Sequence, residues 1–381
     1  MLNTPESRLS ISKAALYPFN KITQGLIRFR DLLDFEIQNV IDFSISVGDD
    51  AGTIVTGKQS SIMISDSVKA SLADVDTLIL NDPGTVFAGN EATFEKFDLI
   101  NKWRAMVLKA NQMGVQVVSV HEIFDTDTLK WINESHAKII IGKQMNENLL
   151  KALDVFDVPS RSYYDRVYEY INSFDTEKTL FTQTKIKKIA ILSTRGCLGK
   201  YTTQMSLYRE LTKRGKKVLP LITEPTAFLY KRDDADLPKF LAERSLQKYP
   251  YYINELVKKA DKEQYEYVIF SGQGSIAPYK ALWLDAMKLN LLQAFGADTT
   301  LLVAGYHDND EIDASIQILR IYGGHQPSAI LIPDKVETHY GSYEMKTAEQ
   351  ISKRKEELKQ LFHIPNVELI HDITRITDIV L

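Results

Sequence analysis

Short runs of apolar, often β-branched residues alternate with longer amphipathic stretches along most of this chain. Such alternation predicts parallel β-sheets whose strands are connected by helices. Residues 91–113 carry apolar side chains at helical spacing and are followed by Gly114, so they are expected to form a helix. Around this helix, apolar runs predict strands at residues 39–47, 77–80, 115–120 and 138–141. The first half is therefore predicted to be an open, Rossmann-like domain.

The second half repeats the alternation with new strands and helices. Strands are expected at residues 187–193, 217–223, 266–270 and 299–304, and helices at residues 201–213, 245–260, 280–295 and 311–322. Residues 346–360 are charged on most faces and are expected to form a solvated surface helix. A polar, tyrosine-rich stretch before residue 187 interrupts the pattern. We therefore expect a first domain at residues 1–160, a linker at 161–186 and a second domain at 187–381.

The composition narrows the functional classes. The 381 residues include 46 basic and 50 acidic side chains, for a formal charge of −4. This near balance lacks the electrostatic footprint of a dedicated nucleic-acid-binding protein, so no nucleic-acid partner is expected. The single cysteine, Cys197, cannot form an internal disulfide, and no apolar run is long enough to span a membrane. The sequence predicts a soluble, cytoplasmic protein without a membrane partner, and leaves open whether it forms a homo-oligomer.

One loop carries the clearest chemical signal. The segment from Ser193 to Thr203, STRGCLGKYTT, connects a predicted buried strand to a predicted helix. This context is typical of a P-loop, in which backbone N–H groups and the helix N-terminus bind phosphate oxygens. Lys200 is expected to pair with the terminal phosphate, and the glycines let the backbone approach the ligand. Relative to the pattern G-x-x-x-x-G-K-[ST], Thr194 replaces the first glycine and Tyr201 replaces the hydroxyl residue. The predicted cofactor-binding residues are Thr194, Gly196, Cys197, Gly199, Lys200, Tyr201, Thr202 and Thr203.

Candidate catalytic residues follow other strands. Magnesium-dependent phosphoryl transfer normally adds a carboxylate at the end of a neighbouring strand, but Ser271 stands there, which leaves Glu224 as the replacement candidate. Gln273 and Ser275 lie on a Gly-Gln-Gly-Ser turn whose glycines suggest close approach of the backbone to a ligand. His307, with Asp308, follows a predicted strand and is a candidate for acid–base work. A helix-capping carboxylate and a tight turn without a ligand are the simpler structural alternatives. The predicted catalytic residues are Glu224, Gln273, Ser275 and His307.

Other cofactors find little support. The seven histidines do not occur at metal-ligand spacing with one another or with cysteine, so no protein-bound metal site is predicted. His121 and Glu122, at the end of a predicted strand, form a further candidate pair for a ligand site. Neither glycine cluster of the first half, at residues 48–57 and 82–89, gives G-x-G-x-x-G between a strand and a helix. A nicotinamide cofactor is therefore disfavoured.

Several segments resemble one protein family. They are GQGSIAP at residues 272–278, GKYTT at 199–203, GLIRFR at 25–30 and GVQVVSVHEIF at 114–124. These segments are similar to parts of the DgcN-like family, whose characterised activity is D-glutamate N-acetylation. The resemblance spans most of the chain. It departs from the family at Ser271 and Ala277, where the family has an acid and a histidine.

The resemblance implies both a fold and a reaction. The fold would be an α/β protein with a Rossmann-like N-terminal domain and a P-loop domain laid out like dethiobiotin synthetase. The reaction would transfer an acetyl group from acetyl-CoA to the amine of an amino acid or a derivative, with Lys200 anchoring the cofactor phosphates and Gln273 and Ser275 orienting the reacting end.

Two other functions remain open at this point. One is a ligase or kinase that uses ATP and Mg²⁺ to activate a carboxylate, as the dethiobiotin-synthetase-like layout allows. The other is a catalytically silent nucleotide-binding partner protein, which the missing acid and histidine at Ser271 and Ala277 would explain.

Overall fold

The computed structural model describes residues 10–43, 46–81, 92–120, 126–141, 184–224, 226–230, 249–272, 274–277, 289, 292–293, 295–339 and 342–381. The chain divides into two units. The first comprises Met1–Tyr170, Pro225–Asp233 and Pro238–Phe240, and the second comprises Ile171–Glu224, Asp234–Leu237 and Leu241–Leu381. The predicted linker at 161–186 falls almost entirely outside the described residues, so the predicted domain limits stay a prediction.

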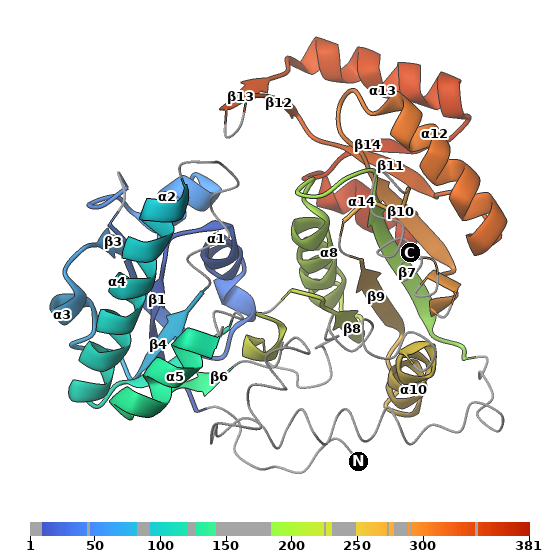
Figure 1. The fold of residues 1–381 in the computed structure, drawn as a ribbon. Helices are drawn as coiled ribbons and strands as arrows, with labels where there is room; N and C mark the ends of the chain where they lie inside the picture. The colour runs from blue at the N-terminus through green and yellow to red at the C-terminus, as the bar shows by residue number, and fades with distance from the viewer. Residues whose placement is uncertain are drawn as a thin grey trace. The chain divides into compact units, whose positions relative to one another are not determined.

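The first unit contains a six-stranded sheet in the order β3-β2-β1-β4-β5-β6 (Figure 1). All neighbouring strands are parallel, which requires a crossover between consecutive strands. This order is that of a doubly wound, Rossmann-like sheet, so the predicted fold class is confirmed for this unit. The strands are β1 (Lys13–Tyr17), β2 (Glu36–Ile41), β3 (Met63–Ser65), β4 (Thr77–Leu80), β5 (Gln116–Ser119) and β6 (Ile140–Ile141).

Helices connect these strands and bury their apolar faces. Asn20 begins α1 by accepting hydrogen bonds from the backbone N–H groups of Ile22 and Thr23. In α4, Trp103 and Val107 are fully buried. The helical segments of this unit are α1 (Lys21–Arg28), η1 (Arg30–Leu32), α2 (Ala51–Thr56), α3 (Val68–Ser71), α4 (Ala92–Gln112), α5 (Thr126–Ser135) and η3 (Ala227–Leu229).

The second unit has its own six-stranded parallel sheet, in the order β14-β11-β10-β7-β9-β8. The last five residues of the central strand β7 are all buried. Helices cover both faces of such a sheet, so its inner strands are continuously apolar rather than alternating. The strands are β7 (Lys187–Ser193), β8 (Val218–Leu221), β9 (Tyr267–Ser271), β10 (Thr299–Val303), β11 (Ala329–Ile332) and β14 (Val367–Leu369), and β12 (Lys335–His339) pairs with β13 (Ser342–Met345) in a separate hairpin.

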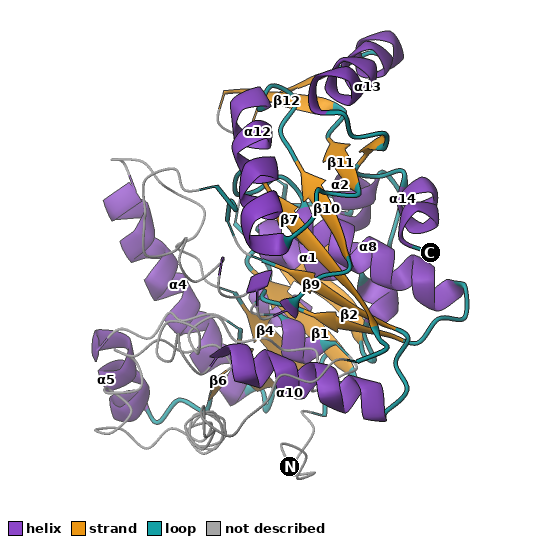
Figure 2. Cartoon of the chain, turned by 90° about the vertical axis from the view of Figure 1, so that its right-hand side faces the viewer, coloured by secondary structure: helices purple, strands orange, loops and turns teal. Residues whose placement is uncertain are grey.

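The helices of the second unit pack on this sheet. Leu207 and Leu211 of α8 join Ile376 of α14 in one buried cluster with strand residues. Figure 2 shows the sheet between these two helices and α12. The helical segments are α8 (Lys200–Lys213), α10 (Tyr249–Lys262), α12 (Asn309–Ile318), the π-helical turn η4 (Leu319–Gly323), α13 (Ala348–Phe362) and α14 (Ile373–Val380).

The predicted elements agree with the structure best where apolar runs are long. The strands predicted at 187–193 and 77–80 have the observed bounds, and the surface helix predicted at 346–360 is α13. The strand predicted at 39–47 is wrong at its end: β2 stops at Ile41, because the N–H of Phe43 bonds to the side chain of Asp42 instead of continuing the ladder. The helix predicted at 311–322 divides into α12 and η4. The one predicted at 280–295 lies almost entirely outside the described residues.

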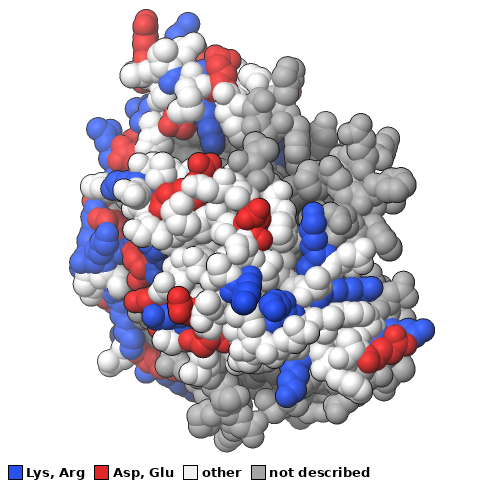
Figure 3. Space-filling view, turned by 90° about the vertical axis from the view of Figure 1, so that its left-hand side faces the viewer, with Lys and Arg blue, Asp and Glu red and all other residues white. Residues whose placement is uncertain are grey.

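The charged side chains do not separate by sign on the face shown in Figure 3. Acidic and basic groups are interspersed there among uncharged residues. This distribution agrees with the near balance of 46 basic and 50 acidic residues. Within the described part of the chain, no helix combines the length and apolar character needed to cross a membrane.

The buried amide of Gln204 gives a test of how α8 is attached to the sheet. This residue is 1% exposed, and its Nε2 donates to the carbonyl oxygens of Leu221, at 2.8 Å, and Ile269, at 3.0 Å. We predict that Gln204→Leu lowers the free energy of unfolding by about 1–3 kcal/mol, because two buried carbonyls lose their donor. Urea unfolding measures this change. The exposed Gln360→Leu is the matched control, and an equal loss in both variants would contradict the assignment.

Candidate functional site

The strand order of the second sheet indicates where a ligand would bind. β7 lies between β9 and β10, and the chain reverses its direction of travel across the sheet at this point. In open parallel sheets, ligands bind outside the carboxyl ends of the strands at such a switch point. The loop predicted to bind phosphate begins at the carboxyl end of β7, so the fold puts it in the expected position.

The loop between β7 and α8 has a special backbone. Cys197 has a φ of 60° and Gly199 a φ of 96°, both in the left-handed region. At Gly199 a side chain would be strained, and its Cβ would lie 3.5 Å from Cδ1 of Ile370. Left-handed residues alternating with right-handed ones turn successive N–H groups towards one concave side, which is a geometry that binds anions.

The backbone donors of this loop have no acceptor within the described protein. The N–H groups of residues 195–199 make no hydrogen bond to any described backbone or side-chain acceptor. The N-cap residue of helix α8, Gly199, makes no side-chain cap hydrogen bond, in contrast to Asn20, which caps α1. An uncapped helix N-terminus and a run of unsatisfied amides are together suited to phosphate oxygens.

Lys200 lies at the start of α8 beside these donors. It is only 8% exposed, and its Nζ donates to Oγ of Ser193, at 2.7 Å, and to the carbonyl oxygen of Gly274, at 2.8 Å. Both of these acceptors are neutral oxygens. A buried ammonium gains more from an anionic partner than from neutral ones, so a phosphate at the loop would be a stronger acceptor for this group.

The loop after β9 packs against the end of β7. The N–H of Ile276 donates to the carbonyl oxygen of Ser193, and Oγ of Ser193 contacts the carbonyl oxygen of Gly274 at 3.0 Å. Ser275, a predicted catalytic residue, is therefore brought next to the phosphate loop, where its Oγ donates to the carbonyl oxygen of Ala277. Gln273 lies outside the described residues, so its prediction remains untested.

Asp308 joins the phosphate loop to the loop after β10. Its Oδ2 accepts hydrogen bonds from Oγ1 of Thr194 at 2.6 Å, Nε of Arg195 at 3.0 Å and the N–H of Gly305 at 2.9 Å. Asp308 and Thr194 are buried, at 7% and 3% exposure. The sequence suggested acid–base work for His307 and Asp308, but this carboxylate is engaged in holding the loop. Asp308 and Thr194 are far apart in the sequence and meet only in the folded chain, so the sequence pattern could not predict this contact.

Glu224 follows β8 at the same edge of the sheet. Oγ1 of the preceding Thr223 donates to the carbonyl oxygen of Ser271 at 3.1 Å, which ties the ends of β8 and β9 together. Glu224 is half-buried. Ser271 is buried at the end of β9, so the side chain nearest to the usual metal-binding position carries no charge.

The remaining predicted residues occupy different surroundings. Gly196 and Cys197 are exposed on the loop, and Tyr201 and Thr202 are half-buried in the first turn of α8. Thr203 is buried and its hydroxyl donates to the carbonyl oxygen of Gly199. The hydroxyl of Thr202 is therefore better placed than that of Thr203 to contact a bound phosphate.

His307 is exposed and contacts the ring of Tyr306 edge to face, with ring centroids 4.9 Å apart. The pair His121 and Glu122 lies outside the described residues. Over the described ranges, no three His, Cys, Asp or Glu side chains are grouped to hold a metal ion.

Comparison with known proteins supports the fold of the second unit. Residues 174–308 match the family model described as "Domain of unknown function (DUF1611_C) P-loop domain". No curated protein matches the chain. Among solved structures, the chain is similar to a DUF1611 family protein from Anabaena variabilis ATCC 29413, with a TM-score of 0.61, 16% identity, and coverage of 97% of this chain and 99% of that chain.

Two further solved structures are more distant. Chloroplast FtsY from Physcomitrella patens gives a TM-score of 0.33 at 12% identity, over 76% of this chain and 89% of that one. A nucleotide-binding protein from Archaeoglobus fulgidus, in complex with ADP, gives 0.33 at 18% identity, over 51% of this chain and 86% of that one. Similarity this low carries no argument about function. The family model and the Anabaena variabilis structure show an α/β protein with a P-loop-like domain, and the predicted DgcN-like membership stays a prediction.

The packing around Asp308 predicts that alanine substitutions at Gly305 and Gly196 have different effects on stability. A Cβ on Gly305 would lie 2.4 Å from Nη2 of Arg195 and 2.5 Å from Oδ1 of Asp308, whereas a Cβ on Gly196 would meet nothing within 4 Å. We predict that Gly305→Ala lowers the free energy of unfolding by about 1–3 kcal/mol, because the side chain forces the ion pair apart. Gly196→Ala should leave stability unchanged or raise it slightly. Urea unfolding distinguishes the two, and a neutral Gly305→Ala would contradict the close packing.

Proposed function

We propose that the second unit binds the phosphates of a nucleotide or nucleotide-like cofactor at residues 193–203. The observation that carries the proposal is the run of five loop amides without an acceptor in the described protein, next to an uncapped helix and a buried lysine. Phosphate oxygens would satisfy all of these groups at once. The matched P-loop family model supports the same interpretation.

For the reaction we propose transfer of an acetyl group from acetyl-CoA to the amine of an amino acid or a related small molecule. In this step the amine nitrogen attacks the thioester carbonyl carbon, the carbon–sulfur bond breaks and an amide forms. The sulfur leaves as CoA thiolate and gains a proton, while the amine loses one to a base such as Glu224 or His307. Lys200 and the loop amides would hold the phosphates of CoA, and Gln273 and Ser275 would orient the reacting end. Ser271 supports this version, because anchoring CoA phosphates needs no metal-binding acid at the end of β9.

A ligase or kinase that uses ATP and Mg²⁺ is the second candidate. The observation in its favour is the hydrogen bond from the hydroxyl of Thr223 to the carbonyl oxygen of Ser271. Because Glu224 follows Thr223 in the chain, this bond keeps Glu224 near the end of β9. A carboxylate at this edge could hold Mg²⁺ against the phosphates. A cytoplasmic location and a small-molecule substrate remain predictions for either version.

The role of Lys200 can be tested by ligand-induced stabilisation. We predict that acetyl-CoA raises the Tm of the wild-type protein and of Lys213→Ala, but not of Lys200→Ala. A ligand at 100 times its Kd stabilises the native state by about 2.7 kcal/mol, which is a measurable shift. Lys213 is the matched control because it is an exposed lysine on the same helix. ATP, GTP and NAD, each with and without Mg²⁺, complete the comparison. Equal shifts in all three proteins with every ligand would contradict the proposal.

Glu224 separates the two candidate reactions. If acetyl transfer is correct, release of CoA thiol in the presence of amino acids should proceed without Mg²⁺, and Glu224→Gln should leave the metal response unchanged. The measurement is thiol release followed with a chromogenic disulfide, alongside ATP consumption. ATP turnover that requires Mg²⁺ and is lost in Glu224→Gln would favour the ligase or kinase. Binding of a nucleotide or CoA without turnover of any donor would identify a silent binding protein.

A further inference from the structure

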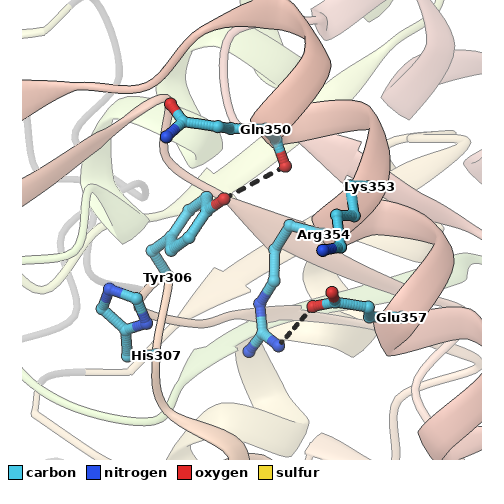
Figure 4. Close-up of a pocket in the computed structure, with 6 residues that line it drawn as sticks. All are labelled: Tyr306, His307, Gln350, Lys353, Arg354 and Glu357. Atoms are coloured by element: carbon cyan, nitrogen blue, oxygen red, sulfur yellow. Dashed lines mark hydrogen bonds and ion pairs between the residues drawn. The ribbon is translucent and has the colours of Figure 1, made fainter.

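A second ligand site lies beside the loop after β10, formed by that loop and α13. Six residues line a pocket with a volume of about 260 Å³: Tyr306, His307, Gln350, Lys353, Arg354 and Glu357. His307, Gln350, Lys353 and Glu357 are exposed, so the pocket is open to solvent. Figure 4 shows the guanidinium group of Arg354 between Tyr306 and Glu357. All six residues belong to the second unit.

The charge of Arg354 is poorly compensated for its burial. This residue is 8% exposed, and its Nη2 donates to the neutral side chain of Asn309. Its Nε is buried and has no hydrogen-bond acceptor in the part of the chain that is described. The guanidinium lies 5.8 Å from the centroid of the Tyr306 ring, which adds only a weak attraction. A buried cation with these partners gains free energy from any anion that reaches it.

Glu357 is the acid that approaches Arg354, and it does so weakly. Its Oε2 lies 3.5 Å from Nη1 of Arg354, too far for a good hydrogen bond, and its side chain is 50% exposed. A carboxylate held this loosely can be displaced at little cost. Glu357 therefore marks the place that a ligand carboxylate would take.

The other lining groups restrict what the ligand can be. The side-chain Oε1 of Gln350 accepts from the N–H of Thr347 in the capping box of α13, and its backbone carbonyl oxygen accepts from the hydroxyl of Tyr306. Besides Tyr306, the lining residues with side-chain donors are His307, Gln350, Lys353 and Arg354. Lys353 and Arg354 are cationic, and Glu357 is the one acid among the six lining residues, so the pocket favours an anion that takes the place of this carboxylate. The rings of Tyr306 and His307 offer a surface for a planar or apolar group.

We propose that this pocket binds the carboxylate of a small organic acid, with Arg354 and Lys353 as the cationic partners and Glu357 as the internal group that the ligand displaces. The proposal is independent of the cofactor site, because it requires no nucleotide or CoA. His307 lies on the rim of this pocket.

Benzoate is a suitable probe, because it combines a carboxylate with a planar ring. Its Kd is measured by ligand-observed NMR on the full chain, without nucleotide or CoA, and each variant is first checked by its thermal melt. Glu357→Gln should lower the Kd about fivefold, because the competing carboxylate is removed. Lys353→Met should raise it by a similar factor, and Lys359→Met, on the same helix but outside the pocket, should leave it unchanged. These variants retain the buried Arg354, so the test does not depend on a variant that fails to fold.

Several results would overturn the proposal. One is a Glu357→Gln protein whose affinity for benzoate is equal to or weaker than that of the wild type, including the case in which neither binds at 10 mM probe, a limit of about 2.7 kcal/mol in binding free energy. Another is an equal loss of affinity in Lys353→Met and Lys359→Met, which would indicate general charge attraction. A third is competition by inorganic phosphate as strong as competition by acetate, which would assign the pocket to phosphate instead.

Discussion

The ammonium group of Lys200, held at the carboxyl ends of β7 and β9, is the interaction on which the site depends. Burying this cation at 8% exposure requires polar partners, and Ser193 at the end of β7 and Gly274 in the loop after β9 provide them. The same contact fixes the start of α8 beside the N–H groups of residues 195–199, which have no acceptor in the described residues. The loop is thus preorganised for an anion by the lysine it carries.

Side chains packed around the phosphate loop also hold its backbone in place. Asp308 restrains the first residues of the loop from the side of β10, and Gln204 attaches α8 to β8 and β9. Both side chains are almost fully buried and hydrogen-bonded to these segments, so they hold the backbone in place. A phosphate-binding loop needs this rigidity, because its donors must point at the ligand before it arrives.

The sequence predicted the parts of the fold that depend on local pattern. The run at 187–193 and the glycines and lysine at 196–200 identify a strand, a turn and a helix start without tertiary information. β1 was missed because its sequence, KAALY, contains no β-branched residue, and its central position in the first sheet comes from pairing with β2 and β4. The contacts of Asp308 with Thr194 and of Arg354 with Tyr306 join residues more than 40 positions apart. Chain spacing carries no information about such contacts.

A crystal structure of the protein with acetyl-CoA, or with ATP and Mg²⁺, tests the central claim most directly. We predict phosphate oxygens within hydrogen-bond distance of the N–H groups of residues 195–200, with Nζ of Lys200 moved from the carbonyl oxygen of Gly274 to a phosphate. Phosphates bound elsewhere, with Lys200 still on Ser193 and Gly274, would contradict it.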